Sequence, residues 1–404
     1  MNLPPSEKLL PAVPLSENTV VTRQAGGRPI ALFLVGFGAF LNLYAPQPLL
    51  PLFRHLFHAT ELEANLTVSA SVLAVALTAP LTGLIADLLG RKGVILLAMV
   101  GLALTTAVAA TATTLVGLIG WRFLQGVFVP GILAVAMAYI SEESPADSVG
   151  SIMATYITGG VVGGFSGRFL SGLITTAWGW QAGFLILGAL TLLSALVTAR
   201  LLPPSRKFVR QRTAAASLHA LIRHLRNPQL LATYAVGFNV LLTIVATFTY
   251  VNFYLADRPF YLGPTALSSI FGVYLIGAAI TPGAGRVIDR IGYRRALIAA
   301  VGVSGGGVLL TLIPILPVVI TGLALLATGV FACQAAATSQ VGRAARQGRS
   351  SAAGLYLALY YLGGAIGSVV PGFVWPYLGW PGCVTVVLAM QGLMAGIAYT
   401  RWRD

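Results

Sequence analysis

Two arginines stand inside otherwise apolar segments of this 404-residue chain. Arg122 lies in the apolar run 115–140 and Arg168 in the run 150–176, each about eight residues from the same end of the layer that the runs would span. At 1.5 Å per residue, both guanidinium groups would lie ~12 Å deep, near the middle of that layer. The planar guanidinium binds carboxylate and phosphate through paired hydrogen bonds, so these positions predict a site for an anionic group.

Both arginines also have a structural interpretation that the sequence leaves open. Arg122 could bond backbone carbonyls and Gln125, which lies one turn away on the same helical face. Arg168 could reach the surface if its helix ends early. The second half of the chain has Ser368 where Arg168 would recur, so we expect the positive charge to be confined to one half.

Acidic residues are missing from the predicted helix interiors. The 11 Asp and Glu residues fall in predicted tails, loops or helix ends, and the interiors contain no His or Lys. Cys333 and Cys383 are isolated, without metal-ligand spacing. The sequence has no Gly-Lys-Ser/Thr nucleotide motif either. We therefore expect no enzyme active site, no metal and no cofactor.

The composition indicates a membrane protein. The chain is 57% hydrophobic and 9% charged, whereas soluble domains carry about 25% charged residues. A helix crosses a bilayer with about 20 apolar residues, and lipid forces each crossing segment to satisfy its own backbone groups. The sequence predicts an all-α integral membrane protein with twelve transmembrane helices, at 29–50, 65–86, 93–112, 115–140, 150–176, 180–201, 229–255, 265–287, 295–314, 317–341, 352–377 and 380–400.

The Lys and Arg residues predict the orientation. They gather in alternate gaps between the predicted helices, and only Arg54 and Arg258 fall in gaps on the other side. Basic loops stay cytoplasmic, so we expect both termini inside a bacterial inner membrane. This distribution also accounts for the net charge of +14 without a nucleic-acid partner. The predicted regions are a disordered tail at 1–28, a six-helix bundle at 29–203, a cytoplasmic linker at 204–228 and a second bundle at 229–404.

The chain repeats itself at half its length. A Pro, Gly, Asp and Gly pattern recurs at an offset of 202 residues, and a glycine pattern recurs at an offset of 200. Two parallel six-helix halves are the expected result. Small residues let helices approach closely, within a half or between the halves. The repeated residues are Gly83, Asp87 and Gly90 with Gly285, Asp289 and Gly292, and Gly163, Gly164 and Gly167 with Gly363, Gly364 and Gly367.

These residues carry a family resemblance over all the predicted helices. The segment from Gly83 to Lys92, its fainter copy from Gly285 to Arg295, and the helix-four motif from Arg122 to Gly126 resemble the major facilitator superfamily. Three further segments resemble its drug/proton antiporter branch, and inner-membrane permeases described as arabinose-efflux-like: 139–143, 166–172 and 355–364. The sequence departs from that branch in two places. Gly163-Gly164 stands where the branch has Gly-Pro, and residues 42–48 lack an acidic residue.

The resemblance implies two sets of functional residues. Asp87 and Asp289 would each cap a helix of the opposite half, with Arg91 and Arg294 adding ion pairs, and these latches would close the cytoplasmic side. Simple turn chemistry is the alternative for them. Polar and aromatic residues of helices one, seven and eleven would line the substrate path, although each could equally be a packing residue. With Arg122, Gln125 and Arg168, the candidates for substrate contact are Asn42, Tyr44, Gln47, Asn239, Tyr356 and Tyr360.

Two transport hypotheses remain. The resemblance implies a monomeric secondary transporter that exports small amphipathic organic compounds by alternating access, linked to protons. The two arginines favour an organic-anion transporter that binds its substrate through Arg122 and Arg168. The expected partners are a small-molecule substrate, membrane lipid and protons. A membrane-embedded enzyme or receptor would need a catalytic constellation or a signalling domain, and neither is apparent in the sequence.

Overall fold

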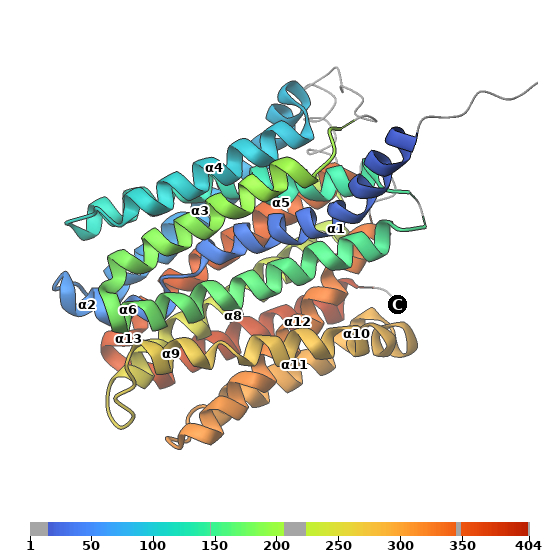
Figure 1. The fold of residues 1–404 in the computed structure, drawn as a ribbon. Coiled ribbons are helices and arrows are strands. Elements are labelled where there is room, and N and C mark those ends of the chain that lie inside the picture. The colour runs from blue at the N-terminus through green and yellow to red at the C-terminus, as the bar shows by residue number, and fades with distance from the viewer. Residues whose placement is uncertain (1–14, 146, 206–223, 345–348, 403–404) are drawn as a thin grey trace, which may run out of the picture.

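The computed structural model of the protein describes residues 15–145, 147–205, 224–344 and 349–402, apart from the side chains at 15–26, 83–84, 87–89, 281–282, 284, 289 and 349–351. All the regular secondary structure in these ranges is helical. The long helices run side by side along one axis (Figure 1). The prediction of an all-α protein is confirmed.

The first half contains α1 (Leu15–Leu43), the short helix η1 (Gln47–Leu49), α2 (Leu50–Leu56), α3 (Glu61–Leu89), α4 (Arg91–Ala109), α5 (Leu115–Glu143) and α6 (Val149–Leu201). At 53 residues, α6 is about twice as long as a bilayer crossing requires. It turns back at Gly179, whose φ of 84° suits glycine because a Cβ would clash there. The element α6 therefore consists of two antiparallel helices joined at Gly179.

The second half repeats this pattern. It contains α8 (Pro228–Ala256), α9 (Pro264–Ile270), α10 (Val273–Ile291), α11 (Tyr293–Leu310), α12 (Leu316–Ala344) and α13 (Arg349–Arg401). Like α6, α13 has 53 residues and turns back at a glycine, Gly379. Gly90 and Gly292 end α3 and α10 with φ values of 79° and 84°. The repeat in the sequence thus appears as a repeat of backbone conformation.

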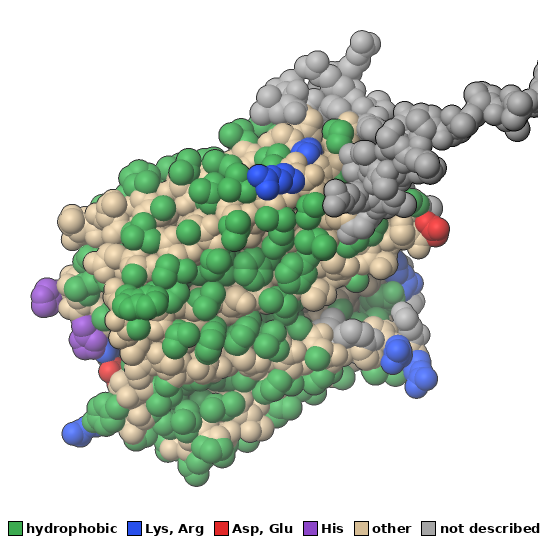
Figure 2. Space-filling model, viewed as in Figure 1, with side chains coloured by type: hydrophobic (Ala, Val, Ile, Leu, Met, Phe, Trp, Pro, Cys, Tyr) green, Lys and Arg blue, Asp and Glu red, His purple; other side chains and the backbone are tan. Residues whose placement is uncertain are grey.

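The helices fit a multi-pass membrane protein. Eight of the described helices are long and apolar enough to cross a membrane, and α6 and α13 are each long enough to cross twice. With α9–α10 and α11 as one crossing each, the arrangement is consistent with twelve spans. Hydrophobic side chains cover the long sides of the molecule, and charged side chains appear near its two ends (Figure 2).

The ends of several predicted segments differ in the structure. Residues 15–28, within the segment predicted as a tail, belong to α1 in the structure. Gly27 packs closely on Leu201, and Arg28 donates to the carbonyl of Glu143 at 3.2 Å, which ties this end of α1 to the rest of the protein. The first predicted helix breaks after Leu43, where three prolines follow within eight residues. Residues 1–14 and most of the predicted linker, 206–223, lie outside the described ranges.

Candidate functional site

Two ends of the molecule are distinguished below. The Arg54 end carries residues 44–60, the bends at Gly179 and Gly379, and residues 257–263. The linker end carries residues 201–205, residues 224–228 and the C-terminus, and it lies at the right in Figure 1. Residues before 206 form the first half, and residues after 223 form the second half.

Glycines bring α6 directly against α1. A Cβ at Gly163 would lie 2.3 Å from the carbonyl oxygen of Phe37, and one at Gly167 would lie 1.9 Å from that of Leu41. Any side chain at these two positions would clash with the backbone of α1. Glycine therefore allows α6 and α1 to lie in direct contact. Arg168, one residue after Gly167, therefore lies beside the turn that follows α1.

The second half repeats this packing, which limits what the six glycines do. Gly363 and Gly367 lie against the carbonyls of Phe238 and Leu242 in α8. Four of the six glycines thus pack helices within one half. Only Gly364 lies close to the other half, where a Cβ would be 3.1 Å from Val72, while Gly164 faces Phe40 and Arg168.

Arg122 is fully engaged by the protein. The side chain is 1% exposed, and its Nε donates to the carbonyl of Thr67 at 2.9 Å. The Nη1 group donates to the carbonyl of Asn42 and to Gln125, and Nη2 donates to the carbonyl of Leu43 and to Ser71. All five N–H groups of the guanidinium therefore have acceptors.

The position of Arg122 has a clear structural purpose. Asn42 and Leu43 end α1, and the last carbonyls of a helix have no partners within it. A cation at that end also interacts favourably with the helix dipole. Arg122 from α5 therefore caps α1 and ties it to α3 through Thr67 and Ser71. The Asn42 side chain faces elsewhere and donates to Thr191 of α6 at 2.7 Å.

Arg168 is also buried, at 4% exposed, but it is only partly engaged. Its Nε donates to Oε1 of Gln47 at 2.7 Å, and its Nη1 donates to the carbonyl of Gly164 at 2.6 Å. These are its only hydrogen bonds to described residues, so three of its five N–H groups remain unused. No described carboxylate forms an ion pair with it.

Aromatic rings surround the Arg168 guanidinium. Its central carbon lies 4.8 Å from the ring centre of Tyr44, 4.9 Å from that of Phe271 and 5.0 Å from that of Tyr274. Such distances are typical of cation–π contacts. These three rings, Tyr44, Phe271 and Tyr274, form a ring cluster that is supplied by both halves.

Gln47 joins the two halves beside this cluster. Its Oε1 accepts from Arg168, and its Nε2 donates to Oγ1 of Thr249 in α8 at 3.0 Å. With both ends of the amide used, its orientation is fixed by its neighbours. A change at Arg168 can therefore act on the second half through a single side chain.

The remaining candidates lie further from Arg168 or in separate contacts. Tyr356 packs on Gly237, donates to Gln334 at 3.1 Å and stacks on Tyr360 at 5.9 Å between ring centres. Asn239 is 2% exposed and donates to the carbonyl of Ala235, one turn earlier in α8. Of the predicted substrate residues, the structure thus brings Tyr44, Gln47 and Arg168 together. It places Asn42, Arg122 and Gln125 in the cap of α1, and it stacks Tyr356 and Tyr360 on each other.

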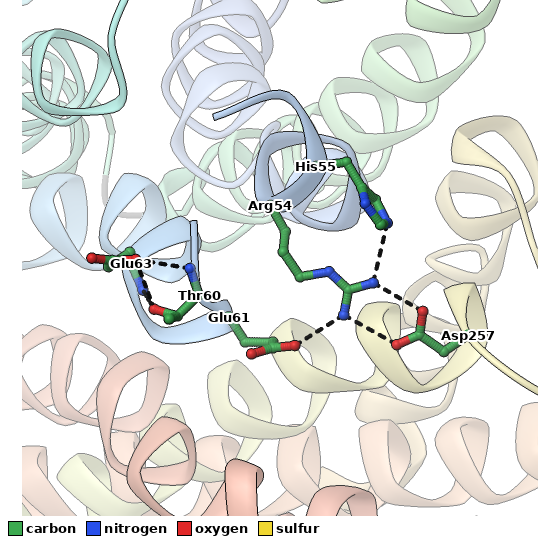
Figure 3. A network of polar contacts seen from close by, with 6 residues as sticks. All are labelled: Arg54, His55, Thr60, Glu61, Glu63 and Asp257. Atoms are coloured by element: carbon green, nitrogen blue, oxygen red, sulfur yellow. Dashed lines mark hydrogen bonds and ion pairs between the residues drawn. The ribbon is translucent and has the colours of Figure 1, made fainter. Parts of the chain in front are cut away.

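A charged network closes the Arg54 end. Arg54 of α2 lies 2.9 Å from Glu61 of α3 and 2.9 Å from Asp257, which follows α8 (Figure 3). Its guanidinium also lies over the ring of Phe253, 5.6 Å from the ring centre. Glu63 instead completes the N-terminal capping box of α3 with Thr60. The Arg54 network, formed by Arg54, Glu61 and Asp257, therefore joins the two halves.

Other contacts between the halves lie toward the same end. Thr176 and Thr265 share a hydrogen bond of 2.8 Å, and a Cβ on Gly172 would lie 2.5 Å from Ser268. Ser69 donates to the carbonyl of Ala365 at 3.1 Å. Among the side chains described, every hydrogen bond or ion pair that joins the first half to the second lies closer to the Arg54 end than to the linker end.

The predicted latch residues lie toward the linker end. The side chains of Gly83, Asp87 and Asp289 are outside the described part of the structure, so the latch stays a prediction. Arg91 pairs with Glu142 at 2.9 Å within the first half, and Arg294 lies over the ring of Tyr399. Gly285 has open space around its Cβ position.

Sequence reasoning missed several residues of the site. Phe271, between α9 and α10, and Tyr274 of α10 contact Arg168 from outside the three helices in which candidates were sought. Thr249 lies one turn before Phe253, in an apolar helix where a hydroxyl gives little signal. Glu61 and Asp257 were interpreted as loop charges, although Asp257 lies on the same predicted side of the membrane as Arg54.

Comparisons with known proteins agree with this architecture. The family model of the Major Facilitator Superfamily matches residues 32–368. The chain is 32% identical to an uncharacterised MFS-type transporter, YybF, of Bacillus subtilis (strain 168), over 89% of each chain. It is also 32% identical to the inner membrane transport protein YnfM of Escherichia coli (strain K12), over 92% of this chain and 89% of that one. A third of the chain is 34% identical to a third of the multi-drug resistance efflux pump PmrA of Streptococcus pneumoniae.

Solved structures share the fold. A mutant of the nucleoside transporter NupG superposes with a TM-score of 0.76 at 16% identity, over 93% of this chain and all of that one. A bacterial homologue of the human lysosomal transporter Spinster, inward-facing and unoccupied, gives a TM-score of 0.73 at 15% identity, over 95% and 99% of the two chains. The helical repeat, the site between the halves and the family match together show that this chain is a membrane transporter of the Major Facilitator Superfamily.

Proposed function

We propose that this protein is a secondary active transporter that exports small amphipathic organic compounds by alternating access. In this proposal it works as a monomer in the bacterial inner membrane, with both termini in the cytoplasm. The substrate site is the ring cluster around Arg168. The observation that carries the proposal is that this site takes residues from both halves, so a rocking motion of the halves would expose it to one side and then the other.

The contacts between the halves support one state of that cycle. The basic loops favour the Arg54 end as the outer face. The Arg54 network and the Thr176–Thr265 contact would then be the closed outer gate. Breaking these contacts is what opening to the outside would require.

Export is the direction that the relatives favour. The local similarity to the efflux pump PmrA is consistent with the drug-export branch that the sequence motifs resemble. Proton linkage is part of the proposal as the usual energy source of that branch. Within the described spans, Asp and Glu residues occur only at the helix ends. The proton would therefore be carried by these residues or by an ionisable substrate.

A disulfide across the gate tests the alternating-access proposal. Cysteines replacing Thr176 and Thr265 would place two sulfur atoms where the hydroxyl oxygens now lie 2.8 Å apart. Oxidation should lock the Arg54 end shut, because a disulfide tolerates little change in distance between its residues. We expect export from proteoliposomes to stop on oxidation and to return on reduction. The native Cys333 and Cys383 are buried, which favours selective reaction of the new pair.

The controls separate locking from damage. Each single cysteine variant should transport normally in both redox states. Transport that continues through a fully formed disulfide would contradict the proposal. Imposing a pH gradient and a membrane potential separately, with acidic, neutral and cationic solutes, would identify the driving force and the direction.

A further inference from the structure

The charge of Arg168 has no counter-charge of the protein's own in the described structure. Arg54, by contrast, pairs with two carboxylates, and Arg122 has five acceptors. Resting on the function proposed above, we propose that the substrate is an organic anion whose carboxylate or sulfonate binds the free edge of Arg168. Burying a cation without a counter-charge costs free energy. An anionic substrate would offset that cost by pairing with Arg168.

The guanidinium of Arg168 keeps N–H groups that no described residue accepts. The centres of three aromatic rings lie within 5.0 Å of the central carbon of the guanidinium. Nε is used by Gln47 and one Nη1 hydrogen by Gly164. The remaining donors are one N–H on Nη1 and two on Nη2, and such groups donate to an oxyanion that lies in the guanidinium plane.

The rings define the rest of the substrate. Tyr44, Phe271 and Tyr274 offer aromatic surface next to the charge, which suits a flat or apolar body. The Tyr44 hydroxyl is buried without a hydrogen-bond partner in the described structure, and it could donate to a second oxygen of the same group. The expected ligand is therefore an amphipathic acid with one anionic end.

Gln47 is a neutral residue at a position where a glutamate would neutralise Arg168. A glutamate at this position would accept from Arg168 as Gln47 does at 2.7 Å. The Thr249 hydroxyl, which now accepts from Nε2 of Gln47, would rotate and donate to the carboxylate instead. The glutamine orients the arginine but leaves its charge uncompensated. The site is therefore selective against cations, because an organic cation would approach an unpaired positive charge.

The test uses solutes that differ in charge and share a body. The probes are benzenesulfonate, benzenesulfonamide and benzamidine, with hexanesulfonate and hexanesulfonamide as the alkyl pair. Binding to the purified full-length protein is measured by calorimetry, and flux is measured in proteoliposomes. We expect each sulfonate to bind roughly tenfold or more tightly than its sulfonamide, as charge-assisted hydrogen bonds imply.

Two variants should remove this preference by different routes. Arg168→Gln removes the cation, and Gln47→Glu neutralises it while leaving it in place. The matched controls are Arg200→Gln, an exposed arginine of α6 beyond the bend at Gly179, and Gln181→Glu, an exposed glutamine near the Arg54 end. Both controls should keep the preference of the unmodified protein. If Arg168→Gln does not fold, Gln47→Glu tests the same point with the arginine intact.

The outcomes distinguish the substrate class from the function. The inference is overturned if a sulfonamide or benzamidine binds as well as the sulfonates, if neither sulfonate binds, or if the preference survives Gln47→Glu. Flux of neutral or cationic solutes that stops on oxidation of the Thr176 and Thr265 cysteine pair would then leave the transport proposal standing. If no solute shows flux that this disulfide blocks, the proposed function itself fails.

Discussion

Arg122 and Arg168 have the same chemistry, similar depth and nearly complete burial, yet their surroundings differ. Arg122 donates all five of its N–H groups to backbone and side-chain oxygens of α1, α3 and α5. Arg168 donates two N–H groups and is surrounded by aromatic side chains from both halves. A charge inside the membrane is therefore not by itself a binding residue. The number of donors left unused distinguishes a structural arginine from one that can bind a ligand.

The largest expected effect is on folding, at Arg122. Arg122→Gln would leave the end carbonyls of α1 without their cap, and each buried polar group left unpaired costs about 1–3 kcal/mol. We expect little or no monodisperse protein in detergent, measured by size-exclusion chromatography. A well-folded Arg122→Gln protein with a selective loss of substrate binding would reverse the comparison.

The next effect is on transport, at Arg168. Arg168→Gln should fold, because the residue contributes only two hydrogen bonds to the described structure. Anion flux should fall roughly ten- to a hundred-fold, as expected for lost hydrogen bonds to a charged group. The measurement is initial flux in proteoliposomes at equal protein content. Unchanged flux would remove Arg168 from the site.

A pair of glycines sharpens the contrast. A Cβ at Gly126, beside the Arg122 cap, would lie 2.1 Å from the carbonyl of Ser71, whereas one at Gly164 would lie 3.4 Å from Nη1 of Arg168. Gly126→Ala should destabilise the protein by about 1–3 kcal/mol, because two helices must separate. Gly164→Ala should leave the melting temperature nearly unchanged and weaken anion binding a few-fold. Equal melting temperatures in the two variants would contradict this.

The smallest effects come from single hydroxyl groups. Ser71→Ala removes one of the five acceptors of Arg122 and should cost about 1 kcal/mol of stability without changing affinity. Thr249→Val removes the acceptor of the Gln47 amide and should weaken anion binding a few-fold without lowering the melting temperature by the same amount. Thermal unfolding and calorimetry on both variants check the pair. A result in the opposite sense at either hydroxyl would weaken the distinction.

Much of the fold could be predicted because lipid imposes simple rules. Apolar runs and a repeated Gly–Asp–Gly pattern predict two helical halves, and the turns at Gly90 and Gly292 adopt matching conformations. The bends at Gly179 and Gly379 were predicted as gaps between helices, but helical hydrogen bonding continues to the glycine on either side. The end of α1 depended on prolines and on Arg122, which lies 79 residues away from Leu43.

The site was only partly predictable, because its contacts join distant segments. The pairing of Arg122 with Gln125 follows from helical spacing, and it is present. The rings of Phe271 and Tyr274 reach Arg168 across the two halves, and Asp257 reaches Arg54 across 203 residues. Such contacts depend on how helices pack, which hydropathy does not encode. Asp87 and Asp289 stay predicted latch residues.

The most direct test of the central claim substitutes lysine at each arginine in turn. Lysine keeps the charge but lacks the planar group that serves five acceptors. We expect Arg122→Lys to be poorly folded, and Arg168→Lys to fold with a nearly normal melting temperature and keep a reduced preference for sulfonate over sulfonamide. A folded, anion-selective Arg122→Lys protein beside an Arg168→Lys protein that fails to fold would contradict the claim.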